Sequence, residues 1–336
     1  MFATRADFEG FLSELPKPDS AARESARKRQ ARLTKPPGSL GVLEDVAVFL
    51  AGWQGSQIRA DRVQVVLFAG NHGVTKQGVS PYPPEVTVQM VANFERGGAA
   101  INAIANTFGL QLTVHPLLLD KPTGDISLED AMTERETLDA LNAGADAVDT
   151  HADIVAIGEM GIGNTTIAAA LCAASLGGSG LDWAGAGTGL DTAGVQHKAK
   201  IIDRALARVA TGESTAFDTL RRLGGRELCA MVGAVCAART KRIPVLLDGF
   251  VACAAMAPVF ARDPSILEHC LAGHRSAERG HARLLERFDL RPLLDLEMRL
   301  GEGSGAAVAV AVVRAAVATH TGMATFESAG VTDRDA

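Results

Sequence analysis

The stretch VQVVLFAGNHG, residues 63–73, decides the fold class. Its first six residues form an apolar run rich in β-branched side chains, and the next five form a glycine-containing break. Apolar runs of this length are typical of strands that are buried on both faces, as in parallel sheets. The stretch therefore predicts a buried parallel strand that ends in a loop.

Similar apolar runs alternate with longer segments of helical spacing in both directions from this strand. The expected strands are residues 112–118, 153–157 and 243–247, and the expected helices are residues 85–105, 134–147, 164–174 and 249–257. This alternation predicts an α/β fold, a parallel sheet with helices on both faces.

Both ends of the chain favour helices instead. Residues 19–32 and 42–53 have helical spacing around the break TKPPGSLG, and residues 291–336 are expected to be helical with a polar tail. We therefore expect a large α/β domain of residues 56–290 beside a small helical domain built from residues 1–55 and 291–336.

Composition excludes several classes of protein. With 336 residues, of which 47% are hydrophobic and 21% charged, the chain can bury a sizeable core. The net charge of -6 argues against a nucleic-acid partner, because neutralising phosphates needs a basic face. The basic stretch of residues 23–35 includes Glu24 and alanines, which is typical of a solvated helix face.

The cysteines and the apolar segments indicate a cytoplasmic protein. None of the five cysteines belongs to a CxxC pair, and buried free thiols fit a reducing compartment. The N-terminal MFATRADFEG lacks the apolar core of a signal peptide. The apolar run of residues 306–313 is too short to cross a bilayer, so no membrane partner is expected.

The glycine-rich loop GEMGIGNTT, residues 158–166, follows one expected strand and opens a helix. Ligands of open parallel sheets bind outside the carboxyl ends of the strands, and a helix N-terminus offers free N–H groups to a phosphate. The loop lacks the lysine of a P-loop and does not match GxGxxG. A plain tight turn is the alternative, but the position favours phosphate binding.

Other glycine-rich segments carry weaker signals. GAGTG at residues 185–189 is a common kind of small-residue turn. His274 and His281 are seven positions apart, which is not the spacing that places two ligands on one helical face, so no metal is expected. Glu302 lies in LGEGSGA at the start of an apolar helix, either as a charge cap or as a carboxylate aimed at a ligand N–H or sugar hydroxyl. Glu159 leaves the same two alternatives open.

Taken together, these segments resemble a known family. TKPPGSLG, AGNHGV, GVSPYPPEVTVQM, GEMGIGNTT, GAGTGLD, LDGF, GHRSAERGH and MRLGEGSGAA occur in this order between about residues 33 and 331. Each motif is weak alone, but the combination resembles the nicotinate-nucleotide:dimethylbenzimidazole phosphoribosyltransferases. The resemblance implies a Rossmann-like large domain, no cofactor, and a homodimer in which the small domain reaches over the partner's active site.

The resemblance also implies a reaction and its residues. The family moves phosphoribose from nicotinate mononucleotide to 5,6-dimethylbenzimidazole with inversion, giving α-ribazole 5'-phosphate and nicotinate for the cobalamin nucleotide loop. By resemblance, Glu302 is the general base and Glu159 a second carboxylate of the active site. The remaining expected site residues are Gly161, Gly163, Asn164, Thr165, Lys198 and Ser276 for phosphate and ribose, and Ser80 and Gln89 for the benzimidazole.

The sequence alone leaves alternatives open for the role of Lys198 and for the class of protein. Lys198 could be an ordinary solvated helix residue, since exposed lysine is the common case. A nucleotide-dependent oxidoreductase would use a similar sheet, although the GxGxxG fingerprint with its downstream acid is missing. A binding protein without catalysis would require Glu159 and Glu302 to be helix caps alone.

The expected reaction predicts activity without a metal ion. The leaving group is a neutral pyridine, so no divalent cation is needed to absorb developing negative charge. Turnover of nicotinate mononucleotide with dimethylbenzimidazole should therefore survive dialysis against a chelator. A strict requirement for added Mg²⁺, measured in the same assay, would contradict this chemistry.

Overall fold

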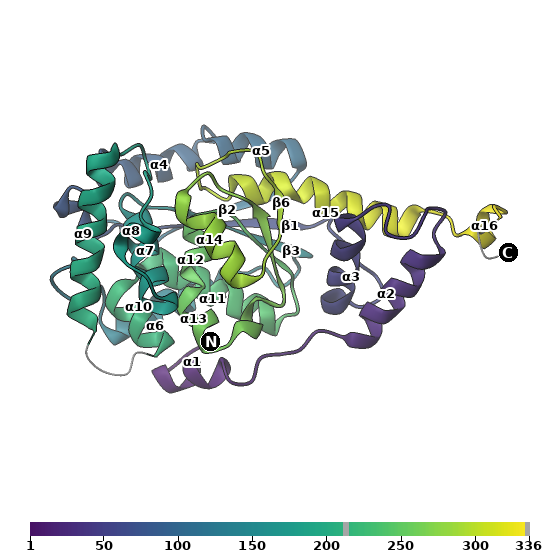
Figure 1. Cartoon of the computed structure of the whole chain (residues 1–336), viewed down its shortest axis with the longest axis horizontal. Helices are drawn as coiled ribbons and strands as arrows, with labels where there is room; N and C mark the ends of the chain where they lie inside the picture. The colour runs from purple at the N-terminus through teal and green to yellow at the C-terminus, as the bar shows by residue number, and fades with distance from the viewer. Residues whose placement is uncertain (211–214, 333–336) are drawn as a thin grey trace.

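One parallel sheet forms the centre of the molecule (Figure 1). The computed structural model describes residues 1–210 and 215–332. The strand order is β2-β1-β3-β4-β5-β6, and every neighbouring pair is parallel. The strands are β1 (Val63–Ala69), β2 (Gln111–Pro116), β3 (Ile154–Met160), β4 (Val245–Leu247), β5 (Cys270–His274) and β6 (Pro292–Leu294). The predicted α/β class is confirmed.

The first strand is apolar because both of its faces are covered. Val65 and Leu67 belong to one hydrophobic cluster, whereas Val66 and Phe68 belong to the other. Successive side chains of a strand point to opposite faces, so a doubly covered strand is apolar at nearly every position. All seven residues of β1 are buried.

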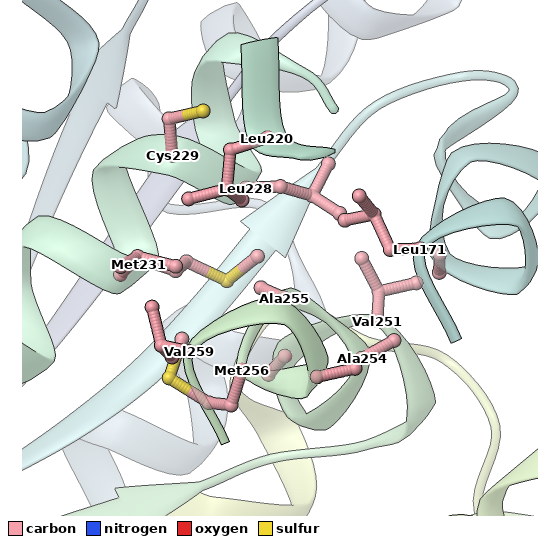
Figure 2. Packing of buried hydrophobic residues seen from close by; sticks show 14 of the residues in the cluster. Leu171, Leu220, Leu228, Cys229, Met231, Val251, Ala254, Ala255, Met256 and Val259 are labelled. Atoms are coloured by element: carbon pink, nitrogen blue, oxygen red, sulfur yellow. The ribbon is translucent and has the colours of Figure 1, made fainter. Parts of the chain in front are cut away.

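Helices cover the two faces of the sheet in separate groups. One face carries α3 (Val42–Gln54), α4 (Glu85–Glu95), α5 (Ala100–Phe108) and α15 (Ser304–Gly322). The other carries α6 (Glu134–Asp146), α7 (Asn164–Leu176), α10 (Ala216–Leu223), α11 (Arg226–Thr240), α12 (Phe250–Ala255) and α13 (Ala257–Arg262). Figure 2 shows the second group packing through side chains such as Leu171, Met231 and Val251.

The remaining helices lie around this core. They are α1 (Arg5–Phe11), α2 (Ser20–Arg32), α8 (Gly180–Trp183), α9 (Thr192–Val209), α14 (Arg279–Phe288) and α16 (Phe326–Ala329). Two short 3-10 helices, η1 (Gly73–Gln77) and η2 (Pro264–Leu267), complete the described elements.

Three details differ from expectation. The single helix expected at residues 85–105 is two helices, α4 and α5, because the chain turns at Gly97 with a φ of +77°. The strand β5 was not expected. The terminal segment 291–336 is not wholly helical, since it begins with β6, a three-residue strand at the edge of the sheet.

Segments from both ends of the chain, though not the N-terminus itself, lie together at one end of the molecule: α2, α3, the far half of α15 and α16 (Figure 1). Leu33 pairs with Thr325 in an isolated bridge, and the Arg29 Nε donates to the carbonyl of His320 over 2.6 Å. In contrast, α1 packs on α10. The domain boundaries at residues 56 and 290 stay a prediction.

The helix α15 is long and apolar enough to cross a membrane by length and composition alone. Its apolar side chains, including Ala306, Val310 and Val313, are buried in the cluster that covers the sheet. It also packs against α3, α5 and β5. These contacts make α15 a core helix.

Glycines let α6 and α11 approach closely, which predicts a destabilising substitution. A Cβ added at Gly233 would overlap the carbonyl oxygen of Leu141, a backbone atom that cannot turn aside. We expect Gly233→Ala to lower the free energy of unfolding by about 1–3 kcal/mol, as overpacking does. Gly322→Ala is the control, because nothing lies within 4 Å of its added Cβ. Equal midpoints for wild type and Gly233→Ala in urea unfolding would contradict this packing.

Candidate active site

A cavity of about 500 Å³ opens at the carboxyl edge of the sheet. Residues that follow β3, β4 and β5 line it, and the loop before α4 adds Tyr82. The strand order reverses between β1 and β3, and ligands of doubly wound sheets bind at such a switch point. The residues that line the cavity include Tyr82, Glu159, Gly161, Asn164, Thr165, Gly187, Thr188, His274, Ser276, Glu278, Arg299, Leu300 and Gly301.

Glu159 is a buried acid near the end of β3. Its Oε2 accepts a hydrogen bond from the side-chain amide of Asn164, in the first turn of α7. Burial and then the nearby carboxyl group of Asp248 raise the pKa of Glu159 from 4.5 to about 8, and Glu227 and Glu302 act in the same direction. A carboxyl group in such surroundings is poised to exchange a proton near neutral pH.

Asp248 directly follows β4 and accepts hydrogen bonds from the N-terminus of α15. Its two carboxylate oxygens accept from the backbone N–H groups of Gly303, over 3.2 Å, and Ala306, over 2.8 Å. Burial raises the pKa of Asp248 to about 7, while these N–H groups favour its charged form. This carboxylate thereby fixes the loop that contains Glu302.

Glu302 occupies a strained position next to the cavity wall. Its φ is +63°, between Gly301 at +83° and Gly303 at +77°. The left-handed region disfavours residues with a Cβ, and such strain costs about 1–3 kcal/mol and gathers at functional sites. Within the described chain its Oε2 is buried without a hydrogen-bond partner. Burial raises the pKa of Glu302, and the backbone N–H of Ile101 partly offsets this rise.

The helix-cap alternative for Glu302 gains no support from this geometry. The N-cap residue of α15 is Gly303, and it makes no side-chain cap hydrogen bond. Asp248 supplies the carboxylate at this helix start. Glu302 instead approaches a backbone N–H in the first turn of α5.

The loop between β3 and α7, residues 161–163, delivers a helix N-terminus to the cavity. Gly163 is the N-cap of α7, with a φ of +91° that favours glycine. The backbone N–H of Ile162 donates to the hydroxyl of the buried Thr87 over 3.1 Å, which anchors the loop to α4. Because the first N–H groups of α7 lack helical partners, this end can bind an anion.

Lys198 is fully buried on α9, which excludes the solvated alternative. Its Nζ donates to the Thr165 hydroxyl over 2.8 Å and to the Gly185 carbonyl over 3.3 Å. Burial lowers the pKa of Lys198 to about 8, although the negative charge of the nearby Glu278 acts in the opposite direction. Since Thr165 lines the cavity, the ammonium group lies directly behind its wall.

The other predicted residues differ in their relation to the cavity. Ser276 lines it, and its Oγ accepts from the backbone N–H of Glu278. Ser80 reaches the wall through its hydroxyl, 3.2 Å from that of Thr188. Gln89 is exposed on α4, on the side away from the buried Thr87 and Val91. A role for Gln89 in this cavity therefore stays a prediction.

Several lining or neighbouring residues were missed from the sequence. Asp248 could have been found, because it directly follows an expected strand in the motif LDGF. Tyr82, Glu278 and Arg299 lie outside the strands and helices, in segments whose course no local pattern predicts, and His274 ends β5, a strand that was not expected. Glu278 adds a second buried acid to the lining.

His274 and His281 differ in their surroundings. The Nε2 of His274 lies 3.6 Å from a carboxylate oxygen of Asp248, and within the described chain neither ring nitrogen of His274 makes a hydrogen bond. The Nδ1 of His281 accepts from the backbone N–H of Ser276 over 2.8 Å. Burial lowers the pKa of both imidazoles. Over residues 1–210 and 215–332, no three His, Cys, Asp or Glu side chains are grouped to hold a metal.

The raised pKa of Glu159 predicts a pH-dependent stability. Between pH 4.5 and about 8 the folded state binds a proton that the unfolded state releases, so the free energy of unfolding falls as pH rises through this range. Glu159→Gln should make the free energy of unfolding fall less steeply with pH above about pH 6.5. In that range the buried histidines are neutral in the folded and the unfolded state and add little to the slope.

Urea unfolding at several pH values measures this slope, and Glu95→Gln, a change at an exposed position of α4, is the control. Equal slopes for wild type and Glu159→Gln would show that Glu159 ionises normally.

Known proteins match the chain along nearly its full length. A family model described as phosphoribosyltransferase matches residues 15–331. The nicotinate-nucleotide–dimethylbenzimidazole phosphoribosyltransferase of Novosphingobium aromaticivorans is 57% identical over 99% of this chain and 98% of its own. That of Rhizobium rhizogenes is 52% identical, over 98% and 97%. A crystal structure of the Thermus thermophilus enzyme of that name is 39% identical, with a TM-score of 0.87 over 94% of this chain and 99% of its own. The chain belongs to the phosphoribosyltransferase family that includes these enzymes.

Proposed function

We propose that this protein transfers the phosphoribosyl group of nicotinate mononucleotide to 5,6-dimethylbenzimidazole with inversion. The products are α-ribazole 5'-phosphate and nicotinate, as the names of the relatives suggest. The observation that carries the proposal is the meeting of buried carboxyl groups and a helix N-terminus at one cavity. A metal-free transfer between two ring nitrogens needs such groups and careful positioning.

The donor half of the reaction uses the wall around α7. The N-terminus of α7 and the buried Lys198 offer positive charge to the donor phosphate, and Thr165 lies between them. Ser276 and Asn164 present polar atoms to the ribose. As the bond to the pyridinium nitrogen breaks, the ribose gains positive charge, which Glu159 can stabilise in its ionised form.

The acceptor half depends on Glu302. One nitrogen of the benzimidazole attacks the anomeric carbon from the face opposite the leaving pyridine. The ring then becomes cationic unless the proton on its second nitrogen departs. The unpartnered Oε2 of Glu302, next to the lining residue Gly301, is the base for that proton.

We also propose a homodimer in the cytoplasm. Tyr82 and Leu300 line the cavity yet are 52% and 56% exposed, so a second copy could cover them. The end formed by α2, α16 and the far half of α15 extends beyond the sheet and suits such a contact (Figure 1). Five buried free cysteines are consistent with a reducing compartment.

Mass spectrometry of the products tests the reaction and the phosphate contact. We expect α-ribazole 5'-phosphate from nicotinate mononucleotide, and little product from nicotinate riboside, which lacks the phosphate. Lys198→Ala should lower kcat/KM for the nucleotide by about ten- to a hundredfold, the usual loss of a charged hydrogen bond. Lys200→Ala, an exposed neighbour on α9, is the control. Equal use of riboside and nucleotide by the wild type would contradict the phosphate site.

A further inference from the structure

A buried, hydrogen-bonded histidine–glutamate pair lies outside the cavity lining and has no part in the chemistry above. The Nε2 of His72 is 2.6 Å from the Oε1 of Glu227, and both side chains are fully buried. Glu227 lies in the first turn of α11, where the helix dipole favours a negative charge. In the described structure the His72 Nδ1 and the Glu227 Oε2 lack hydrogen-bond partners. Burying such groups is costly, so stability alone is a weak reason for the pair.

Three glycines from separate segments enclose this pair. A Cβ at Gly70 or Gly225 would overlap it. A Cβ at Gly161 would lie 2.7 Å from the Gly70 carbonyl oxygen and 3.2 Å from both the Glu227 Oε1 and the His72 Nε2, all tighter than ordinary contact. Since Gly161 lines the cavity, the pair forms the support directly beneath the loop between β3 and α7.

We propose that His72 and Glu227 are a positioning pair for the transfer reaction, holding the loop between β3 and α7 and placing a fixed negative charge behind Glu159. This inference rests on the proposed function. The loop has two supports, the hydrogen bond from Ile162 to Thr87 on one side and the pair beneath Gly161 on the other. Loss of the second support displaces the N-terminus of α7 relative to the donor.

The charge of Glu227 also acts on the acid of the cavity. Glu227 contributes to the raised pKa of Glu159, after burial and Asp248 and before Glu302. The other ionisable groups that interact with Glu227 are Cys229 and His72, with Arg226 adjacent in α11. Arg226 is turned away, since it pairs with Glu136 over 2.6 Å and with the carbonyl of Lys121. The charge of Glu227 therefore raises the pH at which Glu159 becomes a carboxylate.

Two variants of the full-length protein separate position from charge. Glu227→Gln keeps the size and a hydrogen bond but removes the charge, whereas His72→Gln keeps an N–H donor and leaves the charge. We expect Glu227→Gln, which weakens the support beneath Gly161, to lower at least tenfold the kcat/KM that nicotinate mononucleotide reaches above the acidic pKa of the rate profile. Removal of the charge should also move that acidic pKa downward. His72→Gln should lower kcat/KM less and leave that pKa in place. Glu136→Gln on α6 is the control, because it removes the ion-pair partner of Arg226, the neighbour of Glu227 on α11. It should alter only the melting temperature.

The outcomes are distinct. A folded Glu227→Gln protein with the wild-type kcat/KM and pH profile would overturn the proposal, whatever its melting temperature. If Glu227→Gln does not fold, an unchanged kcat/KM in His72→Gln overturns the positioning role. Absence of any turnover in the wild type would refute the proposed function instead. The charge would then still be tested without substrate, because Glu227→Gln must reduce the fall of the unfolding free energy between about pH 6.5 and 8.

Discussion

Burial of several carboxyl groups at one edge of the sheet is the constraint on which the site depends. Glu159 lies near the end of β3 and Asp248 directly after the adjacent parallel strand β4, so both reach the same edge, and Glu302 joins them from just before α15. Burial raises the pKa of all three carboxyl groups, and the charge of Asp248 raises the pKa of Glu159 and Glu302 further. Neighbouring hydrogen-bond donors compensate: α15 offers backbone N–H groups to Asp248, α5 offers one to Glu302, and the side-chain amide of Asn164 binds Glu159.

This arrangement gives similar residues different roles. Asp248 makes several backbone hydrogen bonds and is a structural anion, whereas Glu302 has a buried oxygen free to accept a proton from a ligand. Glu159, with a pKa of about 8, lies where positive charge would develop on the ribose. Environments that push the pKa values of neighbouring acids apart are a means of assigning separate catalytic roles.

Much of this could be predicted from the sequence. The apolar run at residues 63–68 predicted the central strand, since burial on both faces leaves a clear pattern, and the loop after residue 158 predicted the helix start at Asn164. The strand β6 could not be predicted, because three residues beginning with Pro292 carry no periodicity. The approach of Glu227 to Glu159 was also hidden, since it depends on how α11 packs, and the burial of Lys198 depends on a loop fold.

The role of Glu302 is the central claim, and one variant tests it most directly. Glu302→Gln keeps the size of the side chain but cannot accept the proton of the benzimidazole. Turnover and melting temperature are measured on the same protein, together with binding of both substrates. We predict a folded protein that binds both and turns over about a hundred- to ten-thousand-fold more slowly, as loss of a general base does. Turnover within a few-fold of wild type, with a lower melting temperature, would contradict the claim and make Glu302 a structural residue.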